Sequence, residues 1–285
     1  MKLDGKALAA SRRETLRQQI EHYTRTGHTA PCLAVILVGE DPASQIYVRN
    51  KENACLKAGI TPRTWRLSAD TTQKELLDLI AQLNEDETVH GILVQMPLPE
   101  GLDETEVILA IDPAKDVDGL HPENAGRLMA GLDAFVPCTP QGAMYLLEQA
   151  GLDDLSGKKA VVIGRSLLVG KPMAQLLLNK NATVTMCHSR TANLEEEVRH
   201  ADVVVAAVGR PHLIQGDWIK DGAVVIDVGI NRLDTGKLGG DVDTEAAEKR
   251  AAAITPVPGG CGPMTIQILL ENTFKAAKMQ EETHA

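Results

Sequence analysis

The first half of the chain alternates short apolar runs with amphipathic stretches. Residues 33–38 form an apolar run bounded by glycine, which predicts a buried strand. Asp41 followed by Pro42 predicts a helix start, because Asp caps helices and Pro fits their first turn. Gly59 is expected to end this helix near Ala58.

Two further strands are predicted in the first half, at residues 64–67 and 89–95. A helix is expected between them over residues 73–83, and an exposed amphipathic helix over residues 6–26. Strands that alternate with helices are typical of parallel βαβ units, so the pattern predicts an α/β fold.

The second half repeats this alternation with more regular spacing. Its apolar runs are about twenty residues apart, the length of one strand plus one helix in a doubly wound parallel sheet of the Rossmann kind. A helix over residues 140–150 precedes them, and a rigid loop at 256–263 leads to a final helix over 264–279. Residues 111–137, irregular and rich in Pro and Gly, mark the inter-domain region. The runs begin near Ala160, Thr183, Val203 and Ala223.

Composition narrows the class of protein. Of the 285 residues, 44% are hydrophobic but only 2% aromatic, so the core must be aliphatic, as in buried parallel strands. The net charge of −10, without a Lys/Arg cluster, disfavours nucleic acid and membranes as partners. Five scattered cysteines disfavour disulfides and zinc sites, and no signal-peptide core or long apolar run is present, so we expect a cytoplasmic protein.

A glycine-containing turn follows the first apolar run of the second half. Gly164-Arg165-Ser166 stands where a Rossmann strand turns into its helix, whose free N–H groups bind phosphate. The match is imperfect, because Ser166 replaces the usual middle glycine and Gly170 comes one residue late. A turn glycine without a ligand is the alternative, but four regularly spaced strands around the turn favour a dinucleotide site.

The next strand ends without the carboxylate that NAD sites usually carry for the ribose hydroxyls. Residues 187–191 supply hydroxyl and cationic groups instead, among them Ser189, and Arg165 lies on the preceding turn. These groups suit the extra phosphate of NADP, so we predict NADP over NAD, with ordinary loop residues as the alternative. Gly209 and Gly229 follow the third and fourth strands, where backbone can approach a ligand closely, although plain turn glycines are nearly as good an explanation.

Candidate chemistry in the first half centres on a lysine. Ser44, Tyr47 and Lys51 are spaced at i, i+3 and i+7 on one helix face. A lysine beside an aromatic ring can act as general acid or base, but a solvated lysine is the common alternative. Gln95 ends a predicted parallel strand, where such sheets bind ligands. Asp118 stands in a loop, with a turn carboxylate as the alternative and no clustered partners for a metal.

Together these segments resemble the bifunctional methylenetetrahydrofolate dehydrogenase/methenyltetrahydrofolate cyclohydrolase family. The resemblance covers nearly the whole chain and keeps the order and spacing of its segments. They are PASQIYVRNK (42–51), GILVQMPLP (91–99), KDVDG (115–119), GRS with VGKP (164–166 and 169–172), and PVPGG with GPMT (256–260 and 262–265).

The resemblance implies two reactions of one-carbon metabolism. A hydride passes from 5,10-methylenetetrahydrofolate to NADP, and water then opens the methenyl cation to 10-formyltetrahydrofolate. Lys51 would be the acid/base group, Tyr47 would pack against the folate and help hold Lys51, and Gln95 would tune Lys51. Asp118 would accept two N–H bonds from the pterin edge. Folate contacts are further expected from Ser44, Pro97, Pro258, Gly259 and Gly260, and cofactor contacts from Gly164, Arg165, Ser166, Gly170, Ser189, Gly209, Gly229 and Ile230, with Arg165 and Ser189 on the 2′-phosphate.

The resemblance also implies a domain organisation. A folate-binding catalytic domain, residues 1–120, and an NADP-binding Rossmann-like domain, residues 121–285, would flank a cleft. The C-terminal helix, about 264–280, would pack back on the first domain, and the protein would be a homodimer. Cys261 replaces the valine that is usual in the family. We expect it to preserve the loop and make it sensitive to thiol reagents, without a catalytic role.

Three alternatives remain open. Short-chain dehydrogenases share the Tyr47-x-x-x-Lys51 spacing, but their pair follows the dinucleotide turn, whereas here it precedes Gly164. A dinucleotide-binding regulatory module is disfavoured by the set of polar candidates in the first half. A dehydrogenase-only relative is disfavoured by the intact Lys51.

Overall fold

The computed structural model describes residues Met1–His284, and Ala285, the last residue of the predicted second domain, lies outside them. The chain forms two compact units. We call residues 11–136 with 266–285 the three-stranded unit, and residues 1–10 with 137–265 the five-stranded unit. Each is built on a parallel sheet with helices, so the predicted α/β fold class is confirmed. The domain limits at residues 120 and 121 stay a prediction.

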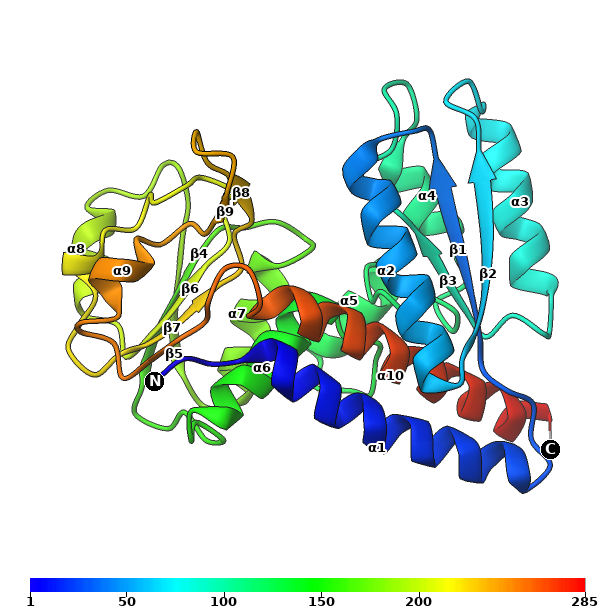
Figure 1. Ribbon diagram of the computed structural model, residues 1–285, viewed down its shortest axis with the longest axis horizontal. Helices are drawn as coiled ribbons and strands as arrows, with labels where there is room; N and C mark the ends of the chain where they lie inside the picture. The colour runs from blue at the N-terminus through cyan, green and yellow to red at the C-terminus, as the bar shows by residue number, and fades with distance from the viewer. Residues whose placement is uncertain (285) are drawn as a thin grey trace. The chain divides into compact units, whose positions relative to one another are not determined.

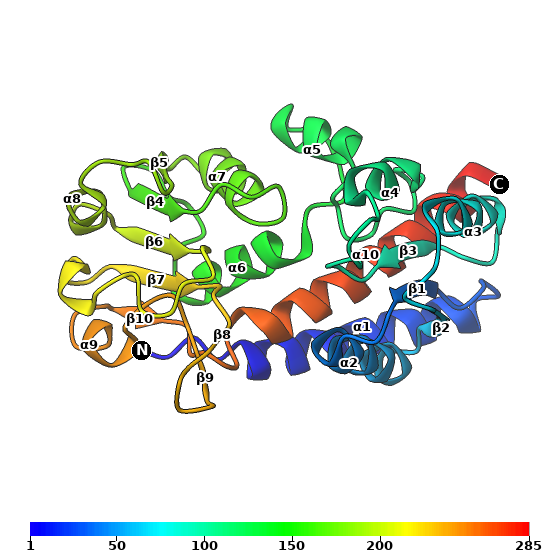
Figure 2. The same cartoon turned by 90° about the horizontal axis from the view of Figure 1, so that it is seen from above.

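In the three-stranded unit, β1 (Cys32–Val38) lies between β2 (Thr61–Leu67) and β3 (Gly91–Val94), and both pairings are parallel. Every residue of β1 is buried, because helices cover both faces of the sheet (Figure 2). One face packs on α3 (Gln73–Glu85) and α4 (Glu104–Ala110). The helix α2 (Pro42–Ala58) covers the other face.

The predicted limits of α2 are confirmed. The Asp41 carboxylate accepts the Ser44 backbone N–H at 2.7 Å, and Pro42 occupies the first turn. Gly59 ends the helix with a positive φ of 83°, a conformation that glycine adopts without strain. Local sequence alone therefore sets both ends of the helix that carries Lys51.

Two predictions in this unit need correction. The strand β2 begins at Thr61 and not at residue 64, because it is an edge strand, where Pro62 can be accommodated without a backbone N–H. Residues 111–137 are not irregular throughout, since α5 (Pro122–Met129) lies within them. The ring Nδ1 of His121 accepts the Glu123 N–H and so caps this helix.

The five-stranded unit confirms the four predicted runs as strands of one parallel sheet (Figure 1). Its strand order is β10-β7-β6-β4-β5, which places β4 and β6 next to each other near the centre. The strands are β4 (Lys159–Ile163), β5 (Thr183–Cys187), β6 (Val203–Ala206), β7 (Val224–Asp227) and β10 (Ala253–Ile254).

Helices cover both faces of this sheet as well. On one face lie α6 (Cys138–Gln149) and α7 (Gly170–Asn179). On the other lie α8 (Leu194–Arg199), the 3-10 turn η1 (Gly216–Trp218) and α9 (Thr244–Ala247), which enclose an aliphatic core. A short antiparallel pair, β8 (Asn231–Arg232) with β9 (Leu238–Gly239), follows β7.

The first and last helices are α1 (Gly5–Arg25) and α10 (Cys261–His284). The latter starts before the predicted residue 264, so the end of the predicted 256–263 loop is helical; Pro263 is tolerated in a first turn. In the three-stranded unit, Glu271 of α10 accepts Arg12 Nε and Nη2 at 2.9 and 2.8 Å. Asn272 donates to the carbonyl oxygen of Val117 at 2.9 Å.

Candidate functional site

The structure joins Lys51 and Gln95 directly. Lys51 Nζ, on α2, donates to Gln95 Oε1 at 3.0 Å. Gln95 follows β3, and its backbone N–H continues the sheet by donating to Ile36 at 2.8 Å. Its side-chain amide donates to the Met96 carbonyl at 2.7 Å, which orients Oε1 toward the amine. This pair is therefore held by a helix on one side and a sheet edge on the other.

The other predicted residues of α2 differ in exposure. The exposed fraction is 3% for Ser44, which is buried, and 42% for Tyr47. Pro97, also predicted to contact substrate, is exposed and follows a cis peptide bond in the loop after β3. The exposed Tyr47 and Pro97 are thus accessible from solvent, and Ser44 is not.

Asp118 lies in a loop that two buried charges hold in place. The ammonium of Lys115 donates to the carbonyl oxygens of Leu83 and Asp86, at the C-terminal end of α3, where a cation is favourable. The carboxylate of Asp116 accepts the backbone N–H groups of residues 120 and 121 and the Asn124 amide. Burial raises the pKa of Asp116 to about 6.

Asp118 follows these two buried residues in the chain and is itself half-buried. Sequence reasoning singled out Asp118 but missed the structural part played by Lys115 and Asp116 in the same KDVDG segment. No local pattern marked these two charges as buried, because their burial depends on which residues pack over them in the folded chain.

In the five-stranded unit, the first turn after β4 is the predicted dinucleotide turn. Gly164 has φ +125°, and a Cβ there would lie 2.3 Å from the Ala207 carbonyl oxygen. A Cβ on Gly170 would lie 2.2 Å from the Gly164 carbonyl oxygen. Both glycines are therefore required by close backbone contacts, and such a side-chain-free turn gives a phosphate room to approach.

Ser166 takes part in the same turn. Its hydroxyl accepts the backbone N–H groups of Val169 at 3.1 Å and Gly170 at 3.4 Å, at the start of α7. The serine in place of the middle glycine thus fixes the turn that leads into α7, whose N-cap residue is Val169. Arg165, beside it, is exposed.

The predicted 2′-phosphate residues stand at the ends of neighbouring strands. Gly164 N–H donates to the Cys187 carbonyl at 2.9 Å, which ties the first turn to the end of β5. The next turn closes through two bonds between His188 and Thr191, both of 2.8 Å. Ser189 lies exposed at its tip. Arg165 and Ser189 therefore extend from adjacent turns.

Gly209, Gly229 and Ile230 occupy the loops after β6 and β7, as expected, and Ile230 is 45% exposed. Sequence reasoning missed two carboxylates beneath these loops, Asp227 and Asp241, which are 1% and 0% exposed. Asp227 ends the apolar strand VVID, and a charge at the end of a buried strand was the available signal.

The Pro-Gly loop before α10 packs against the N-terminus within the same unit. Gly260 N–H donates to Pro256 at 2.9 Å, and Gly259 accepts the Lys6 N–H at 3.0 Å. Pro258, in a cis peptide bond, is exposed. Cys261 is buried, with 6% of its surface exposed, and burial raises the pKa of its thiol to about 12. A shielded, protonated thiol reacts slowly, so these features count against the expected sensitivity to thiol reagents.

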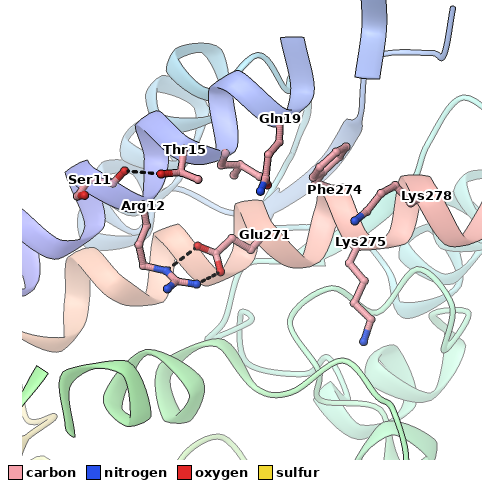
Figure 3. A pocket seen from close by; sticks show the side chains of 9 residues that line it. Ser11, Arg12, Thr15, Gln19, Glu271, Phe274, Lys275 and Lys278 are labelled. Atoms are coloured by element: carbon pink, nitrogen blue, oxygen red, sulfur yellow. Dashed lines mark hydrogen bonds and ion pairs between the residues drawn. The ribbon is translucent and has the colours of Figure 1, made fainter. Parts of the chain in front are cut away.

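The hollow in Figure 3 is not part of this set. It measures about 290 Å³, lies between α1 and α10, and contains none of the predicted site residues. Its lining includes the Arg12–Glu271 ion pair and Lys278. Among the side chains of Met1–Glu282, no three His, Cys, Asp or Glu residues gather to hold a metal ion. Within the same residues, no helix has the length and apolarity needed to cross a bilayer.

The fold and these side chains define an α/β enzyme with a dinucleotide-binding sheet. Residues 3–118 match the model for the tetrahydrofolate dehydrogenase/cyclohydrolase catalytic domain, and residues 137–281 match the NAD(P)-binding domain of the same family. The chain belongs to the tetrahydrofolate dehydrogenase/cyclohydrolase family, and the resemblance in its sequence is confirmed.

Relatives match along nearly their full length. The bifunctional protein FolD of Magnetococcus marinus is 59% identical over 276 residues, covering 97% of this chain and 96% of that protein. A crystal structure of the Campylobacter jejuni bifunctional enzyme FolD is 50% identical, with a TM-score of 0.95 and coverage of 98% and 99%. The Trypanosoma brucei enzyme complexed with NADP and inhibitor is 40% identical, with a TM-score of 0.94 and coverage of 100% and 99%.

Proposed function

We propose that this chain oxidises 5,10-methylenetetrahydrofolate with NADP and hydrolyses the methenyl product to 10-formyltetrahydrofolate. The observation that carries the proposal is the Lys51–Gln95 hydrogen bond in a chain of this family. Relatives such as the Magnetococcus marinus protein are named bifunctional, and the Trypanosoma brucei relative binds NADP. The short-chain-dehydrogenase alternative is not proposed, because Tyr47 and Lys51 lie in the part that matches the tetrahydrofolate-family catalytic domain.

The residues of the three-stranded unit fit the hydrolytic step. Lys51 is the group that accepts and returns a proton as water adds to the methenyl carbon, and Gln95 holds its amine in one position. The half-buried Asp118 presents two oxygens, which suit the paired N–H donors of a pterin edge. The exposed ring of Tyr47 provides a surface for the folate.

The five-stranded unit fits NADP. Gly164 and Gly170 stand at the first turn, where a Cβ on either residue would clash with backbone atoms. A turn without side chains lets a diphosphate approach the backbone closely. Arg165 and Ser189 would hold the 2′-phosphate, and Ser166, Gly209, Gly229 and Ile230 would line the rest of the site. The cofactor supplies the hydride acceptor. Hydride transfer needs no protein nucleophile, so the chain contributes alignment and the exclusion of side reactions.

One assay tests both activities. Purified protein is mixed with 5,10-methylenetetrahydrofolate and NADP, and the NADPH and methenyl absorbances are followed separately. We expect NADPH to form and the methenyl signal to decay faster than in buffer alone. Methenyl product that accumulates and decays only at the buffer rate indicates a dehydrogenase-only enzyme. No NADPH formation at all contradicts the proposal.

The proposal extends to assembly and location. By family membership we propose a homodimer in the cytoplasm. Light scattering after size-exclusion chromatography tests the first part, and a monomer mass at micromolar concentration contradicts it. Fractionation of cells that express the chain tests the second, and recovery in the membrane or secreted fraction contradicts it.

A further inference from the structure

A fully buried carboxylate accepts hydrogen bonds from the loop that follows β6. Asp241 is 0% exposed. Its Oδ2 accepts the backbone N–H groups of Val208 at 2.7 Å and Gly209 at 3.0 Å. Its Oδ1 accepts the Arg210 N–H at 2.8 Å and the side-chain amide of Asn231 at 2.9 Å. One side chain thus fixes three successive residues of the loop after β6 and one residue after β7.

A second carboxylate holds the first in place. Asp227, at the end of β7, accepts the Gly229 and Asp241 N–H groups on Oδ1, both at 3.0 Å. Its Oδ2 accepts the Val242 N–H at 2.9 Å. A Cβ on Gly229 would lie 2.2 Å from Asp241 Oδ1, so the loop after β7 passes directly over this carboxylate. The loops after β6 and β7 and residues 241–242 are therefore joined in one hydrogen-bond network.

The donors around Asp241 are neutral amides, so the carboxylate occupies a position that could otherwise bind an anion. Successive backbone N–H groups that converge on one point form a cradle for an anion. Here the cradle at residues 208–210 is filled by the chain's own carboxylate. A phosphate is therefore not expected at this turn, and the carboxylate acts on the shape of the loop.

The strand order indicates which part of a dinucleotide these loops would face. In a sheet of this kind the diphosphate lies at the first turn, after β4, and the adenine-side ribose lies at the end of the next strand, β5. The strands β6 and β7 are on the opposite side of β4 from β5. The nicotinamide half of a bound dinucleotide would then extend toward the loops after β6 and β7.

We propose that Asp241 is a positioning residue for the nicotinamide half of NADP, an inference that rests on the proposed function. It holds Gly209 and Asn231 in the arrangement that receives the cofactor, and Asp227 fixes Asp241 in turn. Neither carboxylate needs to touch the cofactor, because both are buried beneath the loops.

The test is Asp241→Asn, which keeps the size of the side chain but turns an accepting oxygen into a donor that faces other donors. We expect the Kd for NADP, measured by calorimetry, to rise roughly tenfold, with a parallel rise in the KM for NADP. Hydrolysis of supplied methenyltetrahydrofolate is expected to stay within about twofold, because Lys51 and Gln95 lie in the three-stranded unit. A merely structural role lowers both activities together and leaves the Kd of the folded fraction unchanged.

Asp243→Asn is the matched control. Asp243 is two residues away and caps α9 through the Ala246 N–H, a task that Asn performs as well. Its Kd for NADP is expected to equal that of the wild type. Asn231→Ala, which removes one donor to Asp241, decides the matter if Asp241→Asn does not fold, and we expect a rise of roughly threefold.

An unchanged Kd in folded Asp241→Asn overturns the inference, as does an unchanged Kd in Asn231→Ala where only that variant folds. These results differ from a failure of the proposed function. Wild-type protein that binds NADP but does not turn over methylenetetrahydrofolate contradicts the function and still permits the binding comparison. Wild-type protein that does not bind NADP contradicts both.

Discussion

Lys51 and Gln95 lie on different elements and are joined by a hydrogen bond of 3.0 Å between Nζ and Oε1. Gln95 is itself fixed, because its amide donates to Met96 at 2.7 Å. A flexible lysine side chain is in this way held at one position, which lowers the entropy that must be lost when it meets a reacting group.

Replacement of this amine separates the two activities. We expect Lys51→Met to lower the rate of methenyltetrahydrofolate hydrolysis by about 10²–10⁴-fold, the usual contribution of a general acid or base. The Kd for NADP should be unchanged. Lys57→Met, an exposed lysine on the same helix, is the control and should retain both activities. Full hydrolysis by Lys51→Met rules out the assigned role.

The first dinucleotide turn is predicted to reject even one methyl group. In Gly170→Ala the new Cβ meets the Gly164 carbonyl oxygen at 2.2 Å, and backbone atoms on both sides cannot move aside cheaply. We expect a loss of about 1–3 kcal/mol in the free energy of unfolding and weaker NADP binding. Gly126→Ala in α5, where no atom lies within 4 Å, should leave the Tm unchanged or raise it. Equal Tm values for the two variants contradict the prediction.

Cofactor choice is predicted to depend on Arg165. Removing its charge in Arg165→Ala should raise the KM for NADP by about ten- to a hundredfold, with little change in the KM for NAD, because only NADP carries the 2′-phosphate. The ratio of kcat/KM for the two cofactors is the measurement. Lys158→Ala removes an exposed cation at the other end of β4 and should keep the ratio of the wild type. A ratio that is the same in both variants excludes Arg165 from the phosphate site.

Burial of Asp116 predicts a specific pH dependence of stability. Its pKa is raised to about 6 in the folded protein, mainly by desolvation, whereas the unfolded chain ionises near the ordinary aspartate value. Between about pH 4 and 6 the folded state therefore binds the proton that the unfolded state releases. The contribution of Asp116 to the free energy of unfolding is therefore largest below pH 4. As the pH rises toward 6, the free energy of unfolding falls by about 2–3 kcal/mol.

Denaturant unfolding at several pH values checks this. The free energy of unfolding of Asp116→Asn should lack the decline with rising pH that Asp116 contributes. The exposed Asp70→Asn serves as the control and should follow the wild-type profile. Parallel profiles of Asp116→Asn and wild type between pH 4 and 6 show that the group does not titrate as inferred.

The thiols are predicted to be unreactive while the protein is folded. All five cysteines are buried, and burial raises the pKa of both Cys55 and Cys261 to about 12. A chromogenic disulfide reagent should therefore label native protein slowly and all five thiols only after denaturation. Cys261→Val, which restores the residue usual in the family, should retain both activities. A fast native phase that disappears in Cys261→Val restores the reactivity expected from sequence.

Much of the framework was readable from neighbouring residues. The caps Asp41 and Gly59 set the limits of α2, and the regular apolar runs predicted the strands of the five-stranded sheet. Gly164 and Gly170 were recognised despite imperfect spacing. These features depend on interactions within one or two turns of chain, which composition and spacing encode directly.

Other features were missed because their causes are distant in sequence. The helix α5 was hidden by the prolines and glycines around it, although His121 and Pro122 start it. Lys115 and Asp116 looked like loop charges, yet each is buried with fixed partners. Whether a charge is solvated or buried depends on what packs over it, and no local pattern states that.

The sequence by itself determined the two parallel α/β parts, the helix that carries Lys51 and the glycine turn, because local propensity, capping and hydrophobic periodicity act between near neighbours. Only the tertiary structure decided that Lys51 meets Gln95 and that Asp241 gathers the loops after β6 and β7. The physical reason is that such hydrogen bonds join residues far apart along the chain, and they form only once packing has removed water and brought the partners within reach.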